Sequence, residues 1–66
     1  MNQFNVIRYI NSLKTSPFIK EKLEAYSNTD GFEARLTAVQ NYNDIKNISL
    51  ENSCKKVLHE KMVSLA

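Results

Sequence analysis

The sequence of 66 residues has one cysteine and one glycine, and each shortage argues against a class of site. Cys54 has no second cysteine to pair with, so a disulfide within the chain is impossible. A closed zinc site is not expected either, because Cys54 and His59 are the only residues of their types. A single glycine does not make a phosphate-binding loop, and no apolar run approaches the roughly 18 residues that cross a bilayer. We therefore expect no metal, no cofactor, no small-molecule substrate and no membrane span.

The residues that are present are typical of a folded, cytoplasmic chain. Hydrophobic residues make up 42% and charged residues 24%, a balance that disordered chains lack. The net charge of +2 is too small by itself to indicate a polyanionic partner. The opening residues lack a basic segment followed by an apolar core, so we expect no secretory signal, and the lone cysteine fits the cytoplasm. One domain spanning residues 1–66 is predicted, with self-association as a homodimer to offset its small core.

Apolar residues recur at helical spacing throughout the chain, and no segment alternates for long with the period of two that a strand requires. The polar stretches between them are about three to eight residues long, which is normal for connections in a compact helical fold. The sequence therefore predicts an all-α domain of four short helices. Their predicted ranges are about 2–13, 17–26, 31–42 and 50–65.

Helix-capping residues mark the predicted boundaries. Ser16 precedes the proline that opens the second helix, and Ser49 precedes the fourth. Asp30 is the predicted cap of the third helix, because the stretch "DGFE" resembles a capping box. The stretch "NYNDIKNI" is rich in asparagine, which favours turns, so a loop is predicted there. Ile45 and Ile48 are expected to anchor that loop to the core.

No constellation of catalytic residues is expected. Cys54 and His59 are the most tempting pair, but five residues along a helix place their side chains about 140° apart. Cys54 also falls on the apolar stripe of the fourth helix, where a free cysteine behaves as a small hydrophobe. Glu21 and Glu24 lie on a lysine-rich helix and are typical of a solvated face. We therefore predict that the protein is not an enzyme.

Several side chains favour a protein-binding surface. Lys22 and Lys61 fall within apolar arcs of their helices, where each either packs its stem against the core or marks a face that meets a partner. Phe4 and Val63 point away from the stripes of the two terminal helices, and would form one apolar patch if those helices pack together. The predicted protein interface comprises Phe4, Tyr9, Lys22, Lys61, Met62 and Val63.

DNA binding is the alternative hypothesis, because residues 17–42 have the helix, glycine-containing turn and helix of a DNA-reading motif. Glutamine and asparagine on the third helix can pair with adenine. Asp30 and Glu33 oppose this hypothesis, since phosphates repel carboxylates at the start of a recognition helix. The basic residues are scattered along the sequence, although folding could gather Lys20 with two lysines of the fourth helix. The residues predicted to contact nucleic acid are Arg35, Thr37, Gln40, Asn41, Lys55 and Lys56.

The segments "SPFIKEKLEA" and "DGF" resemble the start of a small bacterial domain associated with nitrogen fixation and with leader peptides of modified natural products. This resemblance covers under half of the chain and transfers no function, because the double-glycine processing site expected of such leaders is absent. The asparagine- and lysine-rich composition suits AT-rich genomes, including those of phages and mobile elements. The sequence thus predicts a small cytoplasmic regulator or inhibitor that docks on another protein through helix faces.

Overall fold

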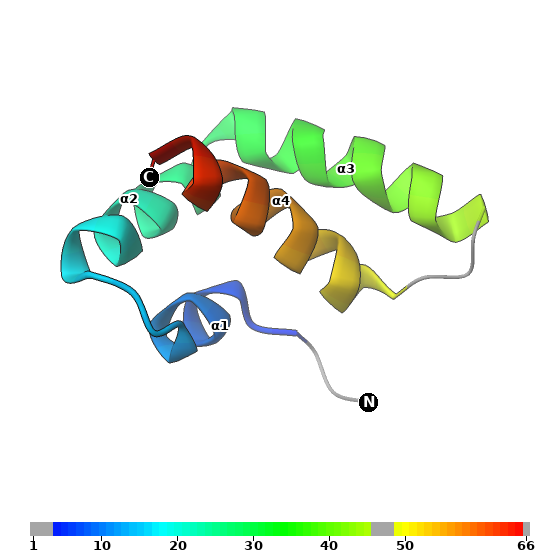
Figure 1. The fold of residues 1–66 in the computed structure, drawn as a ribbon. Coiled ribbons are helices and arrows are strands. Elements are labelled where there is room, and N and C mark those ends of the chain that lie inside the picture. The colour runs from blue at the N-terminus through cyan, green and yellow to red at the C-terminus, as the bar shows by residue number, and fades with distance from the viewer. Residues whose placement is uncertain (1–3, 46–48, 66) are drawn as a thin grey trace.

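The computed structural model describes residues 4–45 and 49–65, and every regular element in them is an α-helix. This confirms the predicted all-α class, and the helices follow one another with short connections (Figure 1). None of these helices is long and apolar enough to cross a membrane. The four helices are α1 (Val6–Ser12), α2 (Pro17–Ser27), α3 (Asp30–Ile45) and α4 (Leu50–Leu65).

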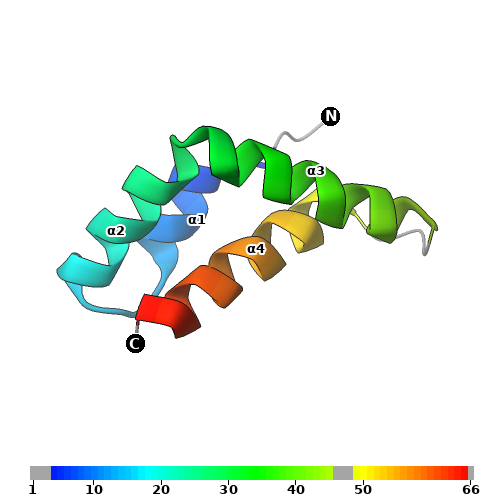
Figure 2. The same ribbon diagram turned by 90° about the horizontal axis from the view of Figure 1, so that it is seen from above.

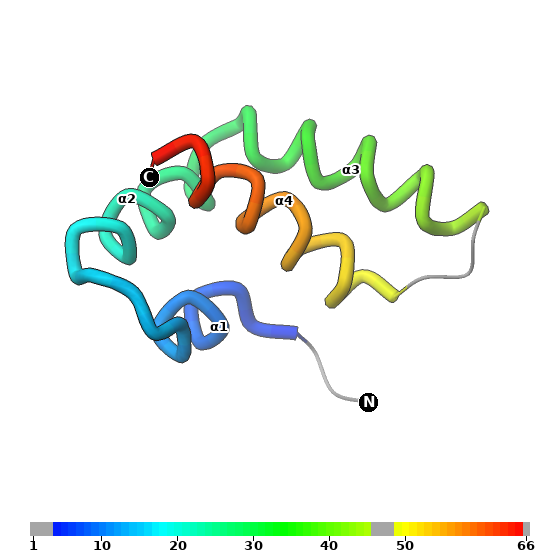
Figure 3. Tube along the Cα trace, in the orientation of Figure 1, coloured from blue at the N-terminus to red at the C-terminus, as the bar shows by residue number. Residues whose placement is uncertain are grey.

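The two longest helices, α3 and α4, lie side by side and run in opposite directions (Figures 1 and 2). Helix α2 contacts both of them at the end where α3 begins, and α1 packs against α2. The tube in Figure 3 follows the chain from α1 through α2 to α3, which lies along the top of the view. The result is a flat molecule of 34 × 25 × 18 Å in which α3 lies along one edge.

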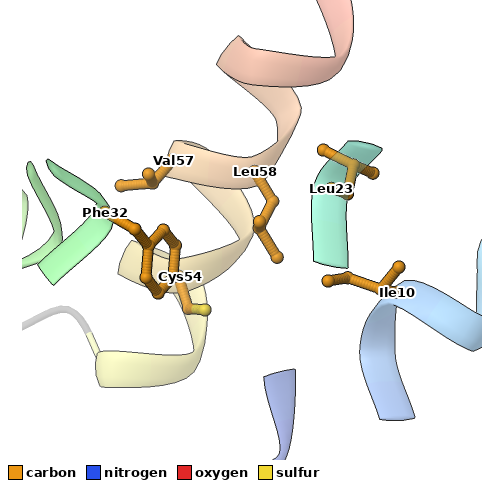
Figure 4. Packing of buried hydrophobic residues seen from close by; sticks show 6 residues of the cluster. All are labelled: Ile10, Leu23, Phe32, Cys54, Val57 and Leu58. Atoms are coloured by element: carbon orange, nitrogen blue, oxygen red, sulfur yellow. The ribbon is translucent and has the colours of Figure 1, made fainter. Parts of the chain in front are cut away.

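The hydrophobic core is centred on α4. Among the described residues six apolar side chains are buried, and Figure 4 shows them converging from all four helices. Half of them come from α4, so this helix provides the surface that the others cover. The apolar stripe predicted for this helix is confirmed except at Leu50, which is 53% exposed, and Met62 and Leu65 are partly buried. The predicted stripe comprises Leu50, Cys54, Val57, Leu58, Met62 and Leu65. The buried apolar residues are Ile10, Leu23, Phe32, Cys54, Val57 and Leu58.

Two of the predicted caps are confirmed. The Ser16 hydroxyl accepts a hydrogen bond from the backbone N–H of Ile19 at 3.3 Å. The Ser49 hydroxyl accepts one from the backbone N–H of Asn52, also at 3.3 Å. Each bond satisfies a backbone N–H that has no partner within its own helix. Local sequence therefore determines where α2 and α4 begin.

The cap predicted for the third helix was wrong by one residue. Asp30 is the first helical residue of α3, and the Thr29 hydroxyl accepts the hydrogen bond from the N–H of Phe32 at 3.2 Å. The same hydroxyl donates to the carbonyl of Tyr26 at 2.7 Å. Thr29 therefore joins the end of α2 to the start of α3, a connection that the capping-box pattern did not reveal.

The first helix begins later than the sequence predicts. The side chain of Asn5 accepts a hydrogen bond from the N–H of Arg8 at 3.0 Å, so α1 begins at Val6. Phe4 precedes this cap and packs against the core, with its ring 5.7 Å from that of Tyr9. The prediction that Phe4 points away from the packed face was therefore wrong. Residues 1–3 lie outside the described residues.

The predicted loop after residue 42 begins as helix. Helix α3 continues to Ile45 because Asn43 is buried against α4, where its amide donates a hydrogen bond to the Ser53 hydroxyl. Ser53 in turn donates to Gln40 at 2.8 Å. Tertiary bonding thus overrides the preference of asparagine for turns. Ile45 is 83% exposed, so its predicted anchoring role was wrong, and Ile48 lies outside the described residues.

We predict that Asn43→Ala lowers the free energy of unfolding by about 1–3 kcal/mol, because it removes a buried hydrogen bond between α3 and α4. Urea titration followed by circular dichroism measures this loss. Asn41→Ala is the matched control, since Asn41 is exposed on the same helix, and its effect should stay within about 0.5 kcal/mol. Equal losses in the two variants would contradict the structural role of Asn43.

We also predict that Thr29→Ala lowers the free energy of unfolding by about 1 kcal/mol through loss of the α3 cap. Asp30→Ala should cost less, because Asp30 contributes only its charge near the helix N-terminus, about 0.3–1 kcal/mol. The same urea titration ranks the two variants. A larger loss for Asp30→Ala would show that the cap is Asp30 after all.

Candidate interaction surfaces

An open cleft of about 410 Å³ lies between the start of α1 and the turn from α2 to α3. We call it the α1 cleft. Phe32, only 4% exposed, contributes to its lining, and Phe4 and Ile7 are among its apolar residues. None of the lining side chains carries a charge. The lining residues are Phe4, Asn5, Val6, Ile7, Ser27, Asn28 and Phe32.

Helix caps hold the α1 cleft in shape. Asn5 is held by its capping bond to the first turn of α1, and the Thr29 cap holds the backbone of Phe32. The Phe32 ring also meets the edge of the Tyr26 ring, at 5.5 Å between centres and 78° between planes. Ser27 donates its hydroxyl to the carbonyl of Glu24 at 2.8 Å. Local contacts therefore hold Asn5, Ser27 and Phe32 of the lining in place, which suits a preformed binding site.

Tyr9 forms the main polar contact between α1 and α4. A hydrogen bond joins its hydroxyl to Nε2 of His59, and the Lys55 ammonium lies 5.5 Å from the centre of its ring. Partial burial raises the pKa of Tyr9, and the nearby charge of Lys55 partly offsets that rise. These contacts join α1 to α4, and Nε2 of His59 is hydrogen-bonded to the Tyr9 hydroxyl.

The structure separates the two residues that sequence analysis considered for catalysis. Cys54 is buried in the core, where burial raises the pKa of its thiol from 9.0 to about 11. His59 lies on the exposed side of the same helix, bonded to Tyr9. The thiol therefore stays protonated at neutral pH, unlike the thiolate that nucleophilic chemistry uses. Among the described residues, no group of three or more histidine, cysteine, aspartate or glutamate side chains could hold a metal ion.

A second, shallower groove of about 240 Å³ runs between α3 and α4. Arg35 and Glu60 form an ion pair at this groove. At the same groove, the Lys56 ammonium lies 5.7 Å from the centre of the Tyr42 ring. Ala38 and Val39 contribute small apolar surface. The groove thus combines apolar surface with charges of both signs, of which two are already paired.

The residues predicted to form a protein interface do not gather on one surface. Phe4 and Tyr9 contact each other, but Val63 lies near the end of α4, which Figures 1 and 2 place away from the start of α1. Lys61 is half-buried, and its ammonium lies 5.0 Å from the centre of the Tyr26 ring. This agrees with the first of the two interpretations of Lys61, in which its stem packs against the core. Lys22 is exposed and lies over the ring of Phe18 at 5.3 Å, and Met62 packs partly buried against the core. Whether any of them binds a partner stays a prediction.

The residues predicted to contact nucleic acid are also dispersed or engaged. Arg35 is paired with Glu60, and Gln40 donates to Asp44 at 2.5 Å while accepting from Ser53. Lys55 is paired with Glu51 at 3.3 Å, as its i, i+4 spacing suggests, and Lys56 lies over Tyr42. Thr37 and Asn41 are exposed on α3.

The Lys20 ammonium lies 3.5 Å from the carbonyl of Asn11, near the end of α1. Whether Lys20, Lys55 and Lys56 form a basic face that binds phosphate stays a prediction.

Sequence reasoning missed the α1 cleft, apart from its inclusion of Phe4. Asn5 could have been predicted to cap α1, but no local signal places the start of α1 next to the turn at Asn28. Comparison with protein-family models, curated proteins and solved structures finds no match to this chain. The resemblance of residues 9–36 to a small bacterial domain gains no support from these comparisons.

The raised pKa of Cys54 predicts a loss of stability at high pH. Below about pH 9 the thiol is protonated in both states, whereas between pH 9 and pH 11 it ionises more readily in the unfolded chain. The free energy of unfolding should therefore fall over this interval. Urea titrations at about pH 8 and about pH 10 should show a smaller fall for Cys54→Ala than for the wild type, since all other titrating groups are shared. Equal falls would show that burial does not raise the pKa of Cys54.

Proposed function

We propose that this chain is a small, non-enzymatic regulator or inhibitor that docks on another protein, with the α1 cleft as its docking site. The observation that supports this proposal is the uncharged lining of a preformed cleft, in which Phe32 is the most buried residue. A bulky apolar side chain of a partner would lose its contact with water against Phe4, Ile7 and Phe32. The amides of Asn5 and Asn28 offer donors and acceptors to the backbone beside that side chain.

The proposal accounts for the sequence features as well. Phe4, predicted for a protein interface, lines the cleft, and Ile7 is 40% exposed there. A lining without charge provides neither the acid–base groups of an enzyme nor the cations that bind phosphate. We place this docking in the cytoplasm, because the single buried thiol needs no oxidising compartment.

The alternative proposal, a DNA-binding regulator that uses residues 17–42, receives less support. The exposed side of α3 carries Asp30 and Glu33 near its start, and its Arg35 is paired with Glu60. The described lysines that could contact phosphate lie on different helices, several of them over aromatic rings. Nonspecific DNA affinity depends on such cations acting together.

A displayed library of random peptides provides a direct test of the α1 cleft. We expect selected peptides to share a bulky apolar residue, and to shift the NMR amide signals of residues 4–7, 27, 28 and 32. Ile7→Glu should weaken their binding at least about tenfold, because it places a charge in the apolar wall. Arg8→Glu is the control, since Arg8 is the exposed neighbour outside the cleft lining, and it should leave binding nearly unchanged.

Two results would count against the proposal. Peptides that bind Ile7→Glu as well as the wild type would place the docking site elsewhere. Labelled duplex DNA provides the other measurement, by fluorescence anisotropy at about 50 mM and about 200 mM salt. Binding that weakens steeply across this range, with no selection of peptides, would favour the DNA-binding alternative.

A further inference from the structure

Side chains, more than backbone packing, join α1 to α4. The backbone of α1 lies mainly against α2, and α1 has only 7 residues, fewer than the roughly 12–15 that an isolated helix needs in water. Two side chains of α1 reach towards α4. Ile10 is buried in the core, and Tyr9 meets His59 and Lys55. Of these two contacts, the one made by Tyr9 involves a group that changes charge near neutral pH.

The Tyr9 hydroxyl is a hydrogen-bond donor to neutral His59. Partial burial raises the pKa of Tyr9, so the hydroxyl keeps its proton at neutral pH. A neutral imidazole that carries its hydrogen on Nδ1 accepts at Nε2, which is the nitrogen that contacts the hydroxyl. The part of the chain that the structure describes gives this hydroxyl no second hydrogen-bond partner.

Protonation of His59 opposes this arrangement in two ways. An imidazolium carries hydrogens on both ring nitrogens, so Nε2 no longer accepts, and the Tyr9 hydroxyl must turn its proton away from its partner. The new charge also lies four residues from Lys55 on the same helix, where like charges are destabilising. The Lys55 ammonium already lies 5.5 Å from the centre of the Tyr9 ring. Two cations would then face one tyrosine.

The charged groups on the surrounding helices do not offset a charge on His59. On α4 itself, Glu51 pairs with Lys55, and Glu60 pairs with Arg35 of α3. From α1, the group in contact with the imidazole is the uncharged tyrosine hydroxyl. No ion pair or hydrogen bond joins a described residue of α2 to α4. Among the described residues, no carboxylate forms an ion pair with the imidazole.

Phe4 connects this contact to the α1 cleft. Its ring centre lies 5.7 Å from that of Tyr9, and the same residue lines the cleft. Ile7, which also lines the cleft, belongs to the same helix as Tyr9. If α1 loosens from α4, these lining residues are no longer held in place. A partner would then have to order them on binding, which lowers its affinity.

We propose that the Tyr9–His59 hydrogen bond is a pH-sensitive contact that holds α1 against α4 while His59 is neutral and weakens when His59 is protonated. Histidine changes charge between about pH 5 and pH 8, and His59 is the only histidine of the chain. Docking in the α1 cleft is therefore tighter at neutral pH than in acid. This last step rests on the function proposed for the cleft, whereas the weakening of the contact does not.

Amide hydrogen exchange of the free protein tests the contact. Protection factors, which are corrected for the intrinsic effect of pH on exchange, should fall about two- to tenfold at Tyr9 and Ile10 between about pH 7.5 and about pH 5.5. This range corresponds to the loss of one hydrogen bond. The amides of Val57 and Leu58 in the buried part of α4 are the internal reference and should change less.

Two variants separate the hydrogen bond from the packing of the rings. His59→Gln keeps a side-chain acceptor and removes the titrating group, so protection in α1 should no longer depend on pH. Tyr9→Phe keeps the ring beside Phe4 and removes the hydroxyl, so protection should be low at both pH values. Circular dichroism confirms that each variant is folded. Protection in α1 that does not change with pH in the wild type, or that falls equally in His59→Gln, would overturn the proposal.

The effect on docking is measured with peptides selected for the α1 cleft that contain no histidine, aspartate or glutamate. Their affinity for the wild type should fall about two- to tenfold between about pH 7.5 and about pH 5.5, and their affinity for His59→Gln should stay the same. A pH-independent affinity for the wild type would overturn the control of docking. If no peptide binds, the exchange measurement still decides whether protonation of His59 loosens α1, so failure of the proposed function is distinguishable from failure of the pH-sensitive contact.

Discussion

The fold depends on the burial of one face of α4. Each of the other helices contributes one large side chain to that face: Ile10 from α1, Leu23 from α2 and Phe32 from α3. A chain this short has little other apolar surface to bury, so each of these contacts carries a large share of the stability. Phe32 also lines the α1 cleft, so this residue belongs both to the core and to the candidate docking site.

The polar contact between Asn43 and Ser53 sets how far α3 continues and how it lies on α4. If α3 shifted along α4, the buried amide of Asn43 would lose its hydrogen-bond partner. This hydrogen bond therefore fixes the position of α3 on α4. The bond keeps α3 helical through Ile45, and this in turn places Tyr42 and Ile45 on the exposed edge of the molecule.

The α1 cleft has an uncharged lining. The positive charges are placed elsewhere, with Lys22 and Lys61 over aromatic rings and Arg35 beside Glu60. Cations held in this way add to packing locally.

The sequence by itself determined the four helices, two caps at Ser16 and Ser49, and most of the α4 stripe, because these depend on spacing and on bonds within a few residues. Tertiary structure decided the rest. It buried Asn43, separated Phe4 from Val63, and assembled the α1 cleft from segments that are far apart in the chain. Such features depend on which helix faces meet, and periodicity shows that a face is apolar without showing what covers it.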